Sequence, residues 1–364
     1  MTSEHYIRRT LQLAARAIGR TATNPMVGAI IVLDRTGEIV AEGYHRGYGL
    51  PHAEVEVIEC AKRKGVQSFS GMTLYVNLEP CCHHGKTPPC SDRIVTEGFR
   101  RVVFGTLDPF AEVSGKGLEF LERHGVKVEH GILEEACKNL NKAFFKQIRT
   151  GIPFVTIKLA QTLDGQIATF NGDSKWISGE SSRRVAHKLR STHDAVLVGA
   201  NTVIADDPEL TVRMVRGNNP WRIVLDSRLR SPLTATVFSD DRVHETILVT
   251  SPSASKKKME SLKKRGVLVL PTSPRIKLKQ VLMQLRNRHN IGSILVEGGS
   301  TVASAFFEKG LVDEFVFFIA PKLLGNGRSA FSGLTAERIS QTHGLEFRAI
   351  KRVGDDLMVT AVPK

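Results

Sequence analysis

One histidine and two cysteines in the first quarter of the chain have side chains that could bind one metal ion together. His52 is followed at a distance by Cys81 and Cys90, and each cysteine comes directly after a proline. One imidazole and two thiolates supply three ligands of a tetrahedral zinc site, and the fourth position then holds water. Zinc lowers the pKa of that water to about 7, which makes hydroxide available at neutral pH. The pattern therefore predicts one catalytic Zn²⁺ per chain, with His52, Cys81 and Cys90 as its ligands.

Glu54 stands two residues after His52, where its carboxylate cannot reach the same metal ion comfortably. It can instead hold the water and move a proton to departing ammonia, as a general acid and base does. A His-x-Glu pair followed by Pro-Cys-x-x-Cys is the signature of zinc nucleobase deaminases. Here Cys90 follows Cys81 by nine positions rather than three. The predicted chemistry is hydrolytic deamination at an amidine-like ring carbon, with Glu54 as the catalytic residue.

The residues between the two cysteines predict a longer loop beside the metal. Lys86 lies in this loop, and a lysine near the site suits a phosphate or another anion on the substrate. Two alternatives remain open. A structural zinc would take His83 or His84 as a fourth ligand, although it would give the nearby carboxylate no role. Cys82 could also replace Cys81 as a ligand.

Two polar residues upstream of His52 carry weaker signals. Asn24 precedes Pro25 before a predicted strand, where an asparagine is often a turn residue but could also present its amide to the edge of a base. His45 is an isolated histidine, and its position alone favours a place on the surface. The residues by themselves leave both roles open.

The second half of the chain has residues that suit phosphates and a nicotinamide ring. Lys158 lies near the end of an apolar strand, where its charge needs a partner. The glycines at 298–299 join a predicted strand to a helix, and such a turn lets a phosphate approach the helix N-terminus. Because no GxGxxG motif is present, an ordinary Rossmann site is disfavoured. Trp176 could cover a nicotinamide or pack in the core, and Arg190 and Arg213 could clamp a phosphate or form surface ion pairs.

The hydrophobic pattern predicts two α/β halves that position these residues. In the first half, strands are expected at 27–33, 38–44, 73–77, 101–105 and 126–129, and helices at 3–19, 53–64, 91–97, 116–123 and 133–147. In the second half, strands are expected at 154–159, 195–198, 221–225, 246–249, 267–270, 293–296 and 314–320, and helices near 180–190, 255–265, 277–288 and 300–308. Gly and Pro interrupt the pattern at 149–153, which predicts domains at 1–148 and 149–364. Strands that alternate with helices indicate an α/β layer fold with some parallel pairing.

Composition agrees with a globular protein of about two domains, since the 364 residues are 41% hydrophobic and 24% charged. No apolar run is long enough to span a membrane, and residues 1–20 lack the pattern of a secretory signal. Five cysteines, an odd number, argue against a disulfide framework and favour a reducing cytoplasm. The net charge of +14 suits a phosphorylated small molecule or nucleic acid. The basic run at 256–265 has no aromatic residues among its charges and predicts the solvated face of a helix.

Three strings in the first half resemble the RibD family of bifunctional riboflavin-biosynthesis deaminase/reductases. They are Asn24-Pro25-Met26-Val27-Gly28, His52-Ala53-Glu54-Val55 and Leu78-Glu79-Pro80-Cys81-Cys82-His83-His84-Gly85-Lys86-Thr87-Pro88-Pro89-Cys90. The resemblance covers essentially the whole chain, and the long loop is specific to this branch of the deaminases. The family usually has Ser where Cys82 stands, which leaves the ligand pair Cys81 and Cys90 intact.

The resemblance implies a fold, an activity and partners. The fold would be an N-terminal cytidine-deaminase-like three-layer domain followed by a C-terminal dihydrofolate-reductase-like α/β domain. The activity would be zinc-dependent deamination of a diaminopyrimidinone that carries a ribosylamino 5′-phosphate, followed by reduction of its ribosyl group to a ribityl chain with NADPH. The partner would be this phosphorylated pyrimidine rather than nucleic acid or a membrane, and the enzyme would be a cytoplasmic homo-oligomer, a dimer or a tetramer.

The resemblance also implies roles for individual residues. Contacts with the pyrimidine or its ribose phosphate in the first domain are implied for Asn24, His45, His83, Lys86 and Thr87. Substrate contacts in the second domain are implied for Ser174, Arg190, Leu210, Arg213 and Glu297. Cofactor contacts are implied for Ala160, Trp176, Thr202, Asp206, Ser227, Gly299, Ser300 and Thr301. Lys158 matches a family lysine near the reacting sugar and is therefore a candidate catalytic residue.

Two other classes of protein share parts of this pattern. A nucleic-acid-editing deaminase with an appended RNA-binding domain would explain the positive charge. The long loop between the cysteines and the aromatic content of only 6% disfavour it, because single-stranded RNA is bound largely by stacking on aromatic side chains. A zinc-stabilised scaffold with decayed sites is disfavoured because His52, Glu54, Cys81 and Cys90 are all present.

Overall fold

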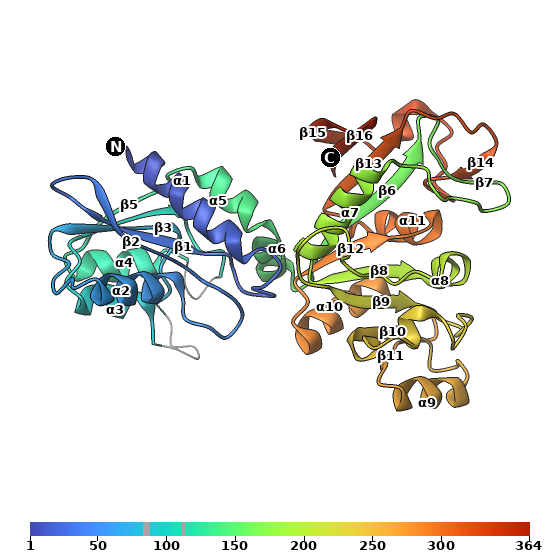
Figure 1. Cartoon of the computed structure of the whole chain (residues 1–364), viewed down its shortest axis with the longest axis horizontal. Helices are drawn as coiled ribbons and strands as arrows, with labels where there is room; N and C mark the ends of the chain where they lie inside the picture. Colours follow the sequence, from blue (N-terminus) through green and yellow to red (C-terminus); the bar gives the residue numbers. More distant parts are fainter. Residues whose placement is uncertain (83–87, 111–113) are drawn as a thin grey trace. The chain divides into compact units, whose positions relative to one another are not determined.

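The computed structural model describes residues 1–82, 88–110 and 114–364. The chain divides into two compact units, Met1–Gly151 and Ile152–Lys364 (Figure 1). Each unit has its own sheet and its own hydrophobic core. The first unit ends directly after helix α6 (Lys142–Thr150), where Gly151 has a left-handed φ of 73° that commonly terminates helices. The helix therefore continues through Arg149 and Thr150, which the sequence places in the interruption.

The sheet of the first unit has the strand order β2-β1-β3-β4-β5. These strands are β1 (Gly28–Leu33), β2 (Glu38–Tyr44), β3 (Met72–Leu78), β4 (Arg101–Thr106) and β5 (Lys127–His130). β1 is antiparallel to β2 and β3, whereas β3, β4 and β5 are parallel to one another. Parallel neighbours need crossover connections, and helices α3 (Cys90–Thr96) and α4 (Lys116–Arg123) provide them.

Helices cover both faces of this sheet and make it a three-layer domain. The remaining helices are α1 (Ser3–Ala14), with a 3-10 turn at Ala15–Ala17, α2 (Ala53–Arg63) and α5 (Glu134–Leu140). Successive residues of β1 point to opposite faces, so that Ile30 lies in one core and Ile31 in the other. The core around Ile30 contains residues of α1 and α5, and the core around Ile31 contains residues of α2, α3 and α4. Figure 1 shows the same separation of the helices.

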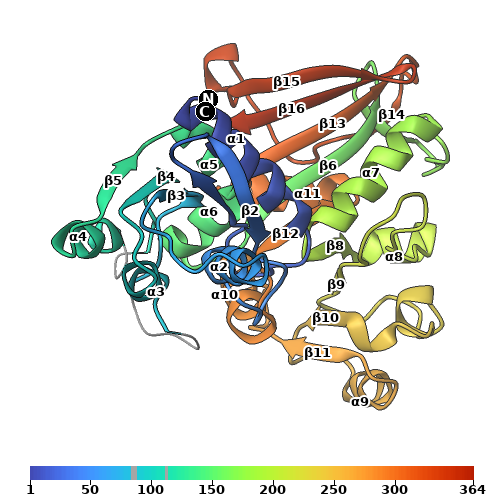
Figure 2. The same ribbon diagram turned by 60° about the vertical axis from the view of Figure 1, so that its left-hand side comes forward.

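The sheet of the second unit has nine strands in the order β11-β10-β9-β8-β12-β6-β13-β16-β15, which can be followed from one edge to the other in Figure 2. Its strands are β6 (Phe154–Thr162), β8 (Ala195–Gly199), β9 (Trp221–Leu225), β10 (Thr246–Thr250), β11 (Leu268–Pro271), β12 (Ser293–Glu297), β13 (Glu314–Ala320), β15 (Leu345–Val353) and β16 (Asp356–Pro363). The strands from β11 to β13 in this order are parallel, and β16 and β15 continue the sheet antiparallel. Two short strands, β7 (Gln166–Thr169) and β14 (Gly327–Ser329), form a separate ribbon.

Helices also pack on both faces of the second sheet. They are α7 (Glu180–Thr192), α8 (Ala200–Asp206), α9 (Lys256–Lys264), α10 (Leu278–His289) and α11 (Ser300–Glu308). Leu197 of β8 lies in the core that contains α10 and α11, while its neighbours Val196 and Val198 lie in the core that contains α8 and α9. The two-residue alternation of a central parallel strand therefore serves two cores, which agrees with the predicted α/β class.

The structure corrects the sequence-based elements at several points. The single helix expected at 133–147 is two helices, α5 and α6, because Asn141 has a non-helical φ of −103° and uses its side chain to bind the backbone of another segment. The elements β7, α8, β14, β15 and β16 were not predicted. β7, α8 and β14 are short, and the pair β15 and β16 exposes much of its surface, so neither group has a strong hydrophobic period.

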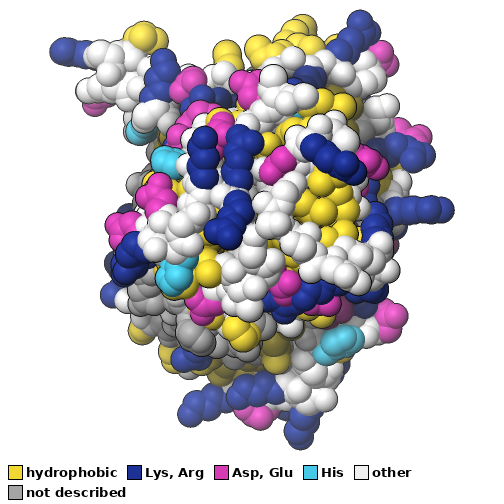
Figure 3. Space-filling view, turned by 90° about the vertical axis from the view of Figure 1, so that its left-hand side faces the viewer, with side chains coloured by type: hydrophobic (Ala, Val, Ile, Leu, Met, Phe, Trp, Pro, Cys, Tyr) yellow, Lys and Arg dark blue, Asp and Glu magenta, His cyan; other side chains and the backbone are white. Residues whose placement is uncertain are grey.

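The charged surface agrees with the interpretation of the basic run. Helix α9 exposes Lys256, Lys257, Lys263 and Lys264 and buries Leu262, as expected for a solvated helix. On the face that Figure 3 shows, Lys and Arg side chains are interspersed with Asp and Glu. Among the described residues, no helix combines the length and the apolar character that crossing a membrane requires.

Close packing of α1 on β1 generates a prediction about stability. A Cβ added at Gly28 would collide with the backbone oxygen of Thr10 and lie 2.8 Å from the backbone nitrogen of Ala14. We expect Gly28→Ala to lower the free energy of unfolding of the first unit by about 1–3 kcal/mol, because α1 must move away from the sheet. Gly71→Ala is the matched control, since a Cβ there meets no atom within 4 Å. Denaturant unfolding measures both, and equal destabilisation by the two variants would contradict the prediction.

Candidate active sites

His52, Cys81 and Cys90 come together beyond the carboxyl end of β3, the central strand of the first unit's sheet. His52 caps the start of α2, Cys81 follows the end of β3, and Cys90 is the first residue of α3. The Nδ1 atom of His52 lies 3.3 Å from the Cys90 sulfur and 3.6 Å from the Cys81 sulfur. The three potential ligand atoms all lie within 4.8 Å of one another. Tetrahedral zinc, with bonds of about 2.1 Å to nitrogen and 2.3 Å to sulfur, separates two such ligands by about 3.6 Å. The donor set therefore fits zinc in both type and spacing.

The protonation of this cluster also favours a cation. The hydrogen bond from Cys90 lowers the pKa of the Cys81 thiol to about 4, and His52 contributes to the same effect. The shared proton raises the pKa of Cys90, whose burial acts in the same direction. The hydrogen bond with Cys81 raises the pKa of His52 to about 9. Zinc would displace the protons on this cluster, because it binds thiolates and neutral imidazole.

Glu54 lies in the first turn of α2 with its carboxyl group buried beside this cluster. The residue is only 4% exposed, and burial raises the pKa of its carboxyl group to about 7, against the opposing charge of His52. It is not among the three residues whose ligand atoms converge. A carboxyl group with a pKa near neutrality can both accept and release a proton at working pH. The geometry therefore suits proton transfer beside the metal rather than coordination.

Asn24 and His45 face each other next to the metal cluster. Asn24 Nδ2 lies 3.3 Å from His45 Nε2, and His45 Nδ1 lies 3.0 Å from the carbonyl oxygen of Pro51. Since the carbonyl can only accept, Nδ1 carries the hydrogen and Nε2 accepts from the amide of Asn24. The His45 ring stands edge-on to His52, with 5.8 Å between centroids. His45 is 3% exposed, so the expectation of a surface location is wrong: the chain after β2 turns inward beside His52.

Three buried amide side chains, which sequence reasoning missed, hold the segment that carries Asn24. Asn77 accepts the Gly28 N–H at 2.8 Å and donates to the Met26 carbonyl at 3.0 Å. Asn141 binds both the N–H and the carbonyl of Met26, at 2.7 and 2.9 Å. Gln147 donates to the carbonyl of Thr23 at 2.8 Å. The sequence could not reveal these three contacts, because the amides lie far from residue 24 in the chain and bind backbone groups, which carry no residue-specific pattern.

Glu79 likewise uses its side chain to bind backbone groups, here those of the segment between β4 and α4. Its buried carboxylate accepts backbone N–H groups of Asp108, Gly115 and Leu118, each at 3.1 Å. These residues belong to the connection between β4 and α4 and to the first turn of α4. The predicted substrate contacts His83, Lys86 and Thr87, together with His84, lie outside the described residues.

A cavity of about 670 Å³ in the second unit collects most of the residues predicted for that half. Its lining includes the candidate catalytic residue and the predicted substrate contacts: Lys158, Ser174, Arg190, Leu210, Arg213 and Glu297. It also includes predicted cofactor contacts: Ala160, Trp176, Thr202, Asp206, Gly299, Ser300 and Thr301. The cavity lies at the carboxyl ends of the parallel strands β8 and β12, where α/β sheets commonly bind ligands.

Ser227 lines a neighbouring cavity of about 140 Å³ instead. The two cavities share Asn201, Thr202, Gly299 and Thr301. Arg230, which was not predicted, also lines the smaller cavity and donates to the side chain of Asn201 at 2.7 Å. Since Gly299 and Thr301 flank the start of α11, an elongated anionic ligand can extend from one cavity to the other across a helix N-terminus.

Glu297 is the electrostatic centre of the larger cavity. The Arg190 guanidinium makes a two-point contact with its carboxylate, at 2.6 and 3.0 Å, and Lys158 Nζ lies 3.9 Å away. β12 and β6 are parallel neighbours in which Glu297 and Lys158 occupy paired positions. Burial alone would raise the pKa of Glu297, but the two cations lower it to about 2. Burial also lowers the pKa of Lys158, which Glu297 partly offsets. The buried partner that Lys158 requires is thus Glu297.

Trp176 is too exposed for core packing, whereas Arg213 lies at the surface beside Glu209. Trp176 is 60% exposed, and the Arg183 guanidinium lies 4.6 Å from the centroid of its ring. Core packing is therefore the wrong interpretation of Trp176. The side chain of Arg213 is half exposed and forms an ion pair with Glu209 at 3.5 Å, which is the surface ion pair that the sequence left as one alternative. Further cations of the lining, which the sequence did not single out, are Lys175, Arg183 and Arg328.

The fold and the two sites define a class of protein, a zinc deaminase joined to a reductase in one chain. Residues 1–106 match the family model "Cytidine and deoxycytidylate deaminase zinc-binding region", and residues 153–359 match "RibD C-terminal domain". The chain is 43% identical to a riboflavin biosynthesis protein RibD of Aquifex aeolicus, over 98% of this chain and 97% of that protein. It is 39% identical to the RibD of Escherichia coli over the full length of both.

Solved structures agree over the whole length. A RibD from Acinetobacter baumannii superposes with a TM-score of 0.89 at 34% identity, covering 100% of this chain and 99% of the other. A diaminohydroxyphosphoribosylaminopyrimidine deaminase/5-amino-6-(5-phosphoribosylamino)uracil reductase from Thermotoga maritima superposes with a TM-score of 0.87 at 38% identity and the same coverage. The chain belongs to the RibD family of bifunctional riboflavin-biosynthesis enzymes. It is a deaminase and a reductase, with a zinc-binding deaminase half and a reductase half of the kind that uses NADPH.

The geometry of the metal cluster predicts which of two adjacent cysteines binds zinc. We expect Cys81→Ser to lose most of its zinc, because the sulfur of Cys81 faces His52 Nδ1 at 3.6 Å. Cys82→Ser is the matched control and should retain one zinc per chain, since its sulfur is not part of the converging set. Metal analysis of the purified full chains measures both variants. Loss of zinc from Cys82→Ser with retention in Cys81→Ser would reverse the assignment.

Proposed function

We propose that the first unit deaminates a diaminopyrimidinone ribosylamino 5′-phosphate and that the second unit reduces the ribosyl group of the product to a ribityl chain. The observation that carries this proposal is the presence of two sites in one chain. One is the cluster of His52, Cys81 and Cys90 beside the buried Glu54, and the other is a cavity rich in Lys and Arg at the carboxyl end of a parallel sheet. The Thermotoga maritima protein is named for the same pair of reactions, a pyrimidine deaminase and a uracil reductase, which supports the proposal.

In the deaminase half, His52, Cys81 and Cys90 would hold zinc, which supplies a coordinated water of lowered pKa. Glu54 would take a proton from the attacking water and deliver it to the amino group, so that a carbon–oxygen bond forms and ammonia leaves as the carbon–nitrogen bond breaks. Asn24 and His45 would contact the pyrimidine, since their polar atoms lie beside the cluster. We also assign contacts with the ring or its phosphate to His83, Lys86 and Thr87, which their place between the two cysteines supports.

In the reductase half, bound NADPH would supply a hydride for the sugar carbon that bears the amino group, while the bond from that carbon to the ring oxygen breaks and the oxygen takes up a proton from water. The residues of the chain would orient the two ligands. We propose that Trp176, Ala160, Thr202, Asp206, Ser227 and the segment from Gly299 to Thr301 contact the cofactor. Lys158 would lie near the reacting sugar, as its place in the cavity supports. Ser174, Arg190, Leu210, Arg213 and Glu297 would contact the substrate, with the half-exposed Arg213 on its phosphate.

The state of assembly is also part of the proposal. We infer a homo-oligomer, a dimer or a tetramer, because the edge strand β15 exposes Phe347 at 64% and Ile350 at 59%. Exposed apolar side chains on the edge of a sheet commonly mark a pairing surface. We propose a location in the cytoplasm, which the absence of a disulfide among the five described cysteines supports.

The role of Glu54 can be tested without disturbing the metal. We expect Glu54→Gln to retain zinc and to lose ammonia release by a factor of about 10²–10⁴, the usual contribution of a general acid and base. Glu59→Gln, on the same helix but paired with Arg93 at the surface, is the matched control. NADPH oxidation with the deaminated pyrimidine supplied directly should be unchanged in both variants. Deamination at the wild-type rate by Glu54→Gln would refute the proton-transfer role.

The role of Arg213 predicts a defect confined to the reductase half. We expect Arg213→Ala to raise the KM for the phosphorylated substrate about ten- to a hundredfold, because a charged hydrogen bond contributes about 1.5–3 kcal/mol. The kcat and the rate of deamination should change little. Arg216→Ala is the control, since Arg216 is exposed nearby and does not line the cavity. A KM equal to that of the wild type would remove Arg213 from phosphate recognition.

A further inference from the structure

We propose that His187 is a positioning residue for phosphate recognition in the reductase half. In its neutral form it accepts a hydrogen bond from the backbone N–H of Arg213 and so fixes where that arginine stands at the cavity. This inference rests on the proposed function, because His187 would act only through Arg213, which the proposed function assigns to the substrate phosphate.

The loop at 209–213 departs from regular structure and depends on other segments for its hydrogen bonds. It forms no helix or strand, and Leu210 within it is buried with a left-handed φ of 56°. Since the loop has no helical or strand hydrogen bonds of its own, its backbone groups need partners from side chains or water. Four side chains outside the loop supply them.

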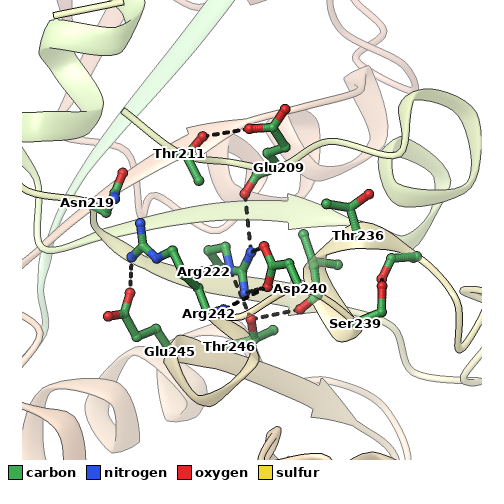
Figure 4. A network of polar contacts seen from close by, with 12 residues as sticks. Glu209, Thr211, Asn219, Arg222, Thr236, Ser239, Asp240, Arg242, Glu245 and Thr246 are labelled. Atoms are coloured by element: carbon green, nitrogen blue, oxygen red, sulfur yellow. Dashed lines mark hydrogen bonds and ion pairs between the residues drawn. The ribbon is translucent and has the colours of Figure 1, made fainter. Parts of the chain in front are cut away.

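The first of these side chains is Arg222 of β9, which is fully buried. Its guanidinium donates to the Glu209 carbonyl at 3.4 Å and is fixed by Asp240 at 2.5 and 2.8 Å and by Thr246 at 3.0 Å (Figure 4). Asn219, also labelled in Figure 4, accepts the Val212 N–H at 2.6 Å. These contacts secure the start and the middle of the loop.

The other two side chains come from one face of α7. Arg190 donates to the Thr211 carbonyl at 2.9 Å while its other nitrogens bind Glu297. His187 lies one turn earlier on the helix, and its Nδ1 lies 3.2 Å from the backbone nitrogen of Arg213. Among the four side chains, His187 is therefore the one that binds the backbone N–H of Arg213, the residue proposed to contact the phosphate.

The direction of this hydrogen bond defines the state of the imidazole. A backbone N–H can only donate, so Nδ1 must be unprotonated and the ring must be neutral, with its hydrogen on Nε2. His187 is 5% exposed, and burial together with the charges of Arg190 and Arg213 lowers its pKa to about 4. Its surroundings thus maintain the one form that can accept from Arg213.

The side chain of Arg213 does not secure its own position. Its contacts within the chain are long, 3.5 Å to both Glu209 and Thr211, and half of the side chain is exposed. The backbone of Arg213 consequently sets the direction from which the guanidinium enters the cavity. Loss of the acceptor at 187 would release this peptide and leave its N–H without a partner.

Reductase kinetics of the full chain test the inference. We expect His187→Leu, which removes the acceptor, to raise the KM for the phosphorylated substrate about tenfold. The KM for the dephosphorylated analogue, the KM for NADPH and the kcat should stay within about twofold of the wild type. His187→Asn should restore the KM to within about threefold, because its carboxamide oxygen can occupy the place of Nδ1. Lys188→Ala, on the exposed face of the same helix, is the matched control.

The outcomes separate positioning from mere packing. If His187→Leu does not fold, His187→Ala takes its place, since it removes the acceptor without adding bulk. Equal KM values for His187→Asn and His187→Leu, or an equal rise for the phosphorylated substrate and its dephosphorylated analogue, would overturn the inference. A rise with Arg213→Ala but none with His187→Leu would overturn only the role of His187, whereas no effect from Arg213→Ala would overturn the proposed phosphate contact as well.

Discussion

Backbone outside helices and strands has to find hydrogen-bond partners wherever the fold shields it from water, and both sites of this chain depend on such partners. In the first unit, Asn77, Asn141 and Gln147 supply partners to the segment that carries Asn24. In the second unit, His187 and Arg222 do the same for the loop that carries Arg213. The groups that would meet substrate therefore hold their places through neighbouring side chains that bind their backbone.

Charge neutralisation is the second constraint that the two halves share. Two sulfurs and an imidazole converge in the first unit, and a buried carboxylate faces two cations in the second. Removing charges from water is costly unless each has a close partner. In the deaminase half, zinc would balance the charge of the thiolates, because the two sulfurs and the imidazole would bind it together. In the reductase half, Arg190 and Lys158 already neutralise Glu297, so the cavity can combine a fixed negative centre with further Lys and Arg side chains in its lining.

The comparisons confirm the family, the fold class, the two activities and the need for zinc and NADPH. Residue types and spacing had predicted the zinc site and the deamination, whereas the reductase activity and NADPH were implied by the resemblance to the family. The individual contacts with substrate and cofactor remain predictions. Most expected strands lie within a residue or two of the observed ones, because buried strands carry a strong hydrophobic signal. The helix expected at 133–147 was wrong, since Asn141 leaves helical geometry to bind Met26, a contact more than a hundred residues away in sequence. His45 was wrongly expected at the surface for the same reason: its burial depends on segments that only the folded chain brings near.

The amino-acid sequence by itself determined the chemistry that is available. A histidine, a glutamate and two cysteines at characteristic spacings specify zinc and proton transfer, and periodic hydrophobic residues specify two α/β cores. Only the tertiary structure decided which polar groups meet: the facing of Asn24 and His45, the partner of Lys158, the exposure of Trp176 and the acceptor for the Arg213 peptide. The physical reason is that metal ligation and hydrophobic burial are encoded by residue type and period, whereas a hydrogen bond to backbone can be made by many polar residue types at any separation in sequence, so that only the fold shows which of them makes it.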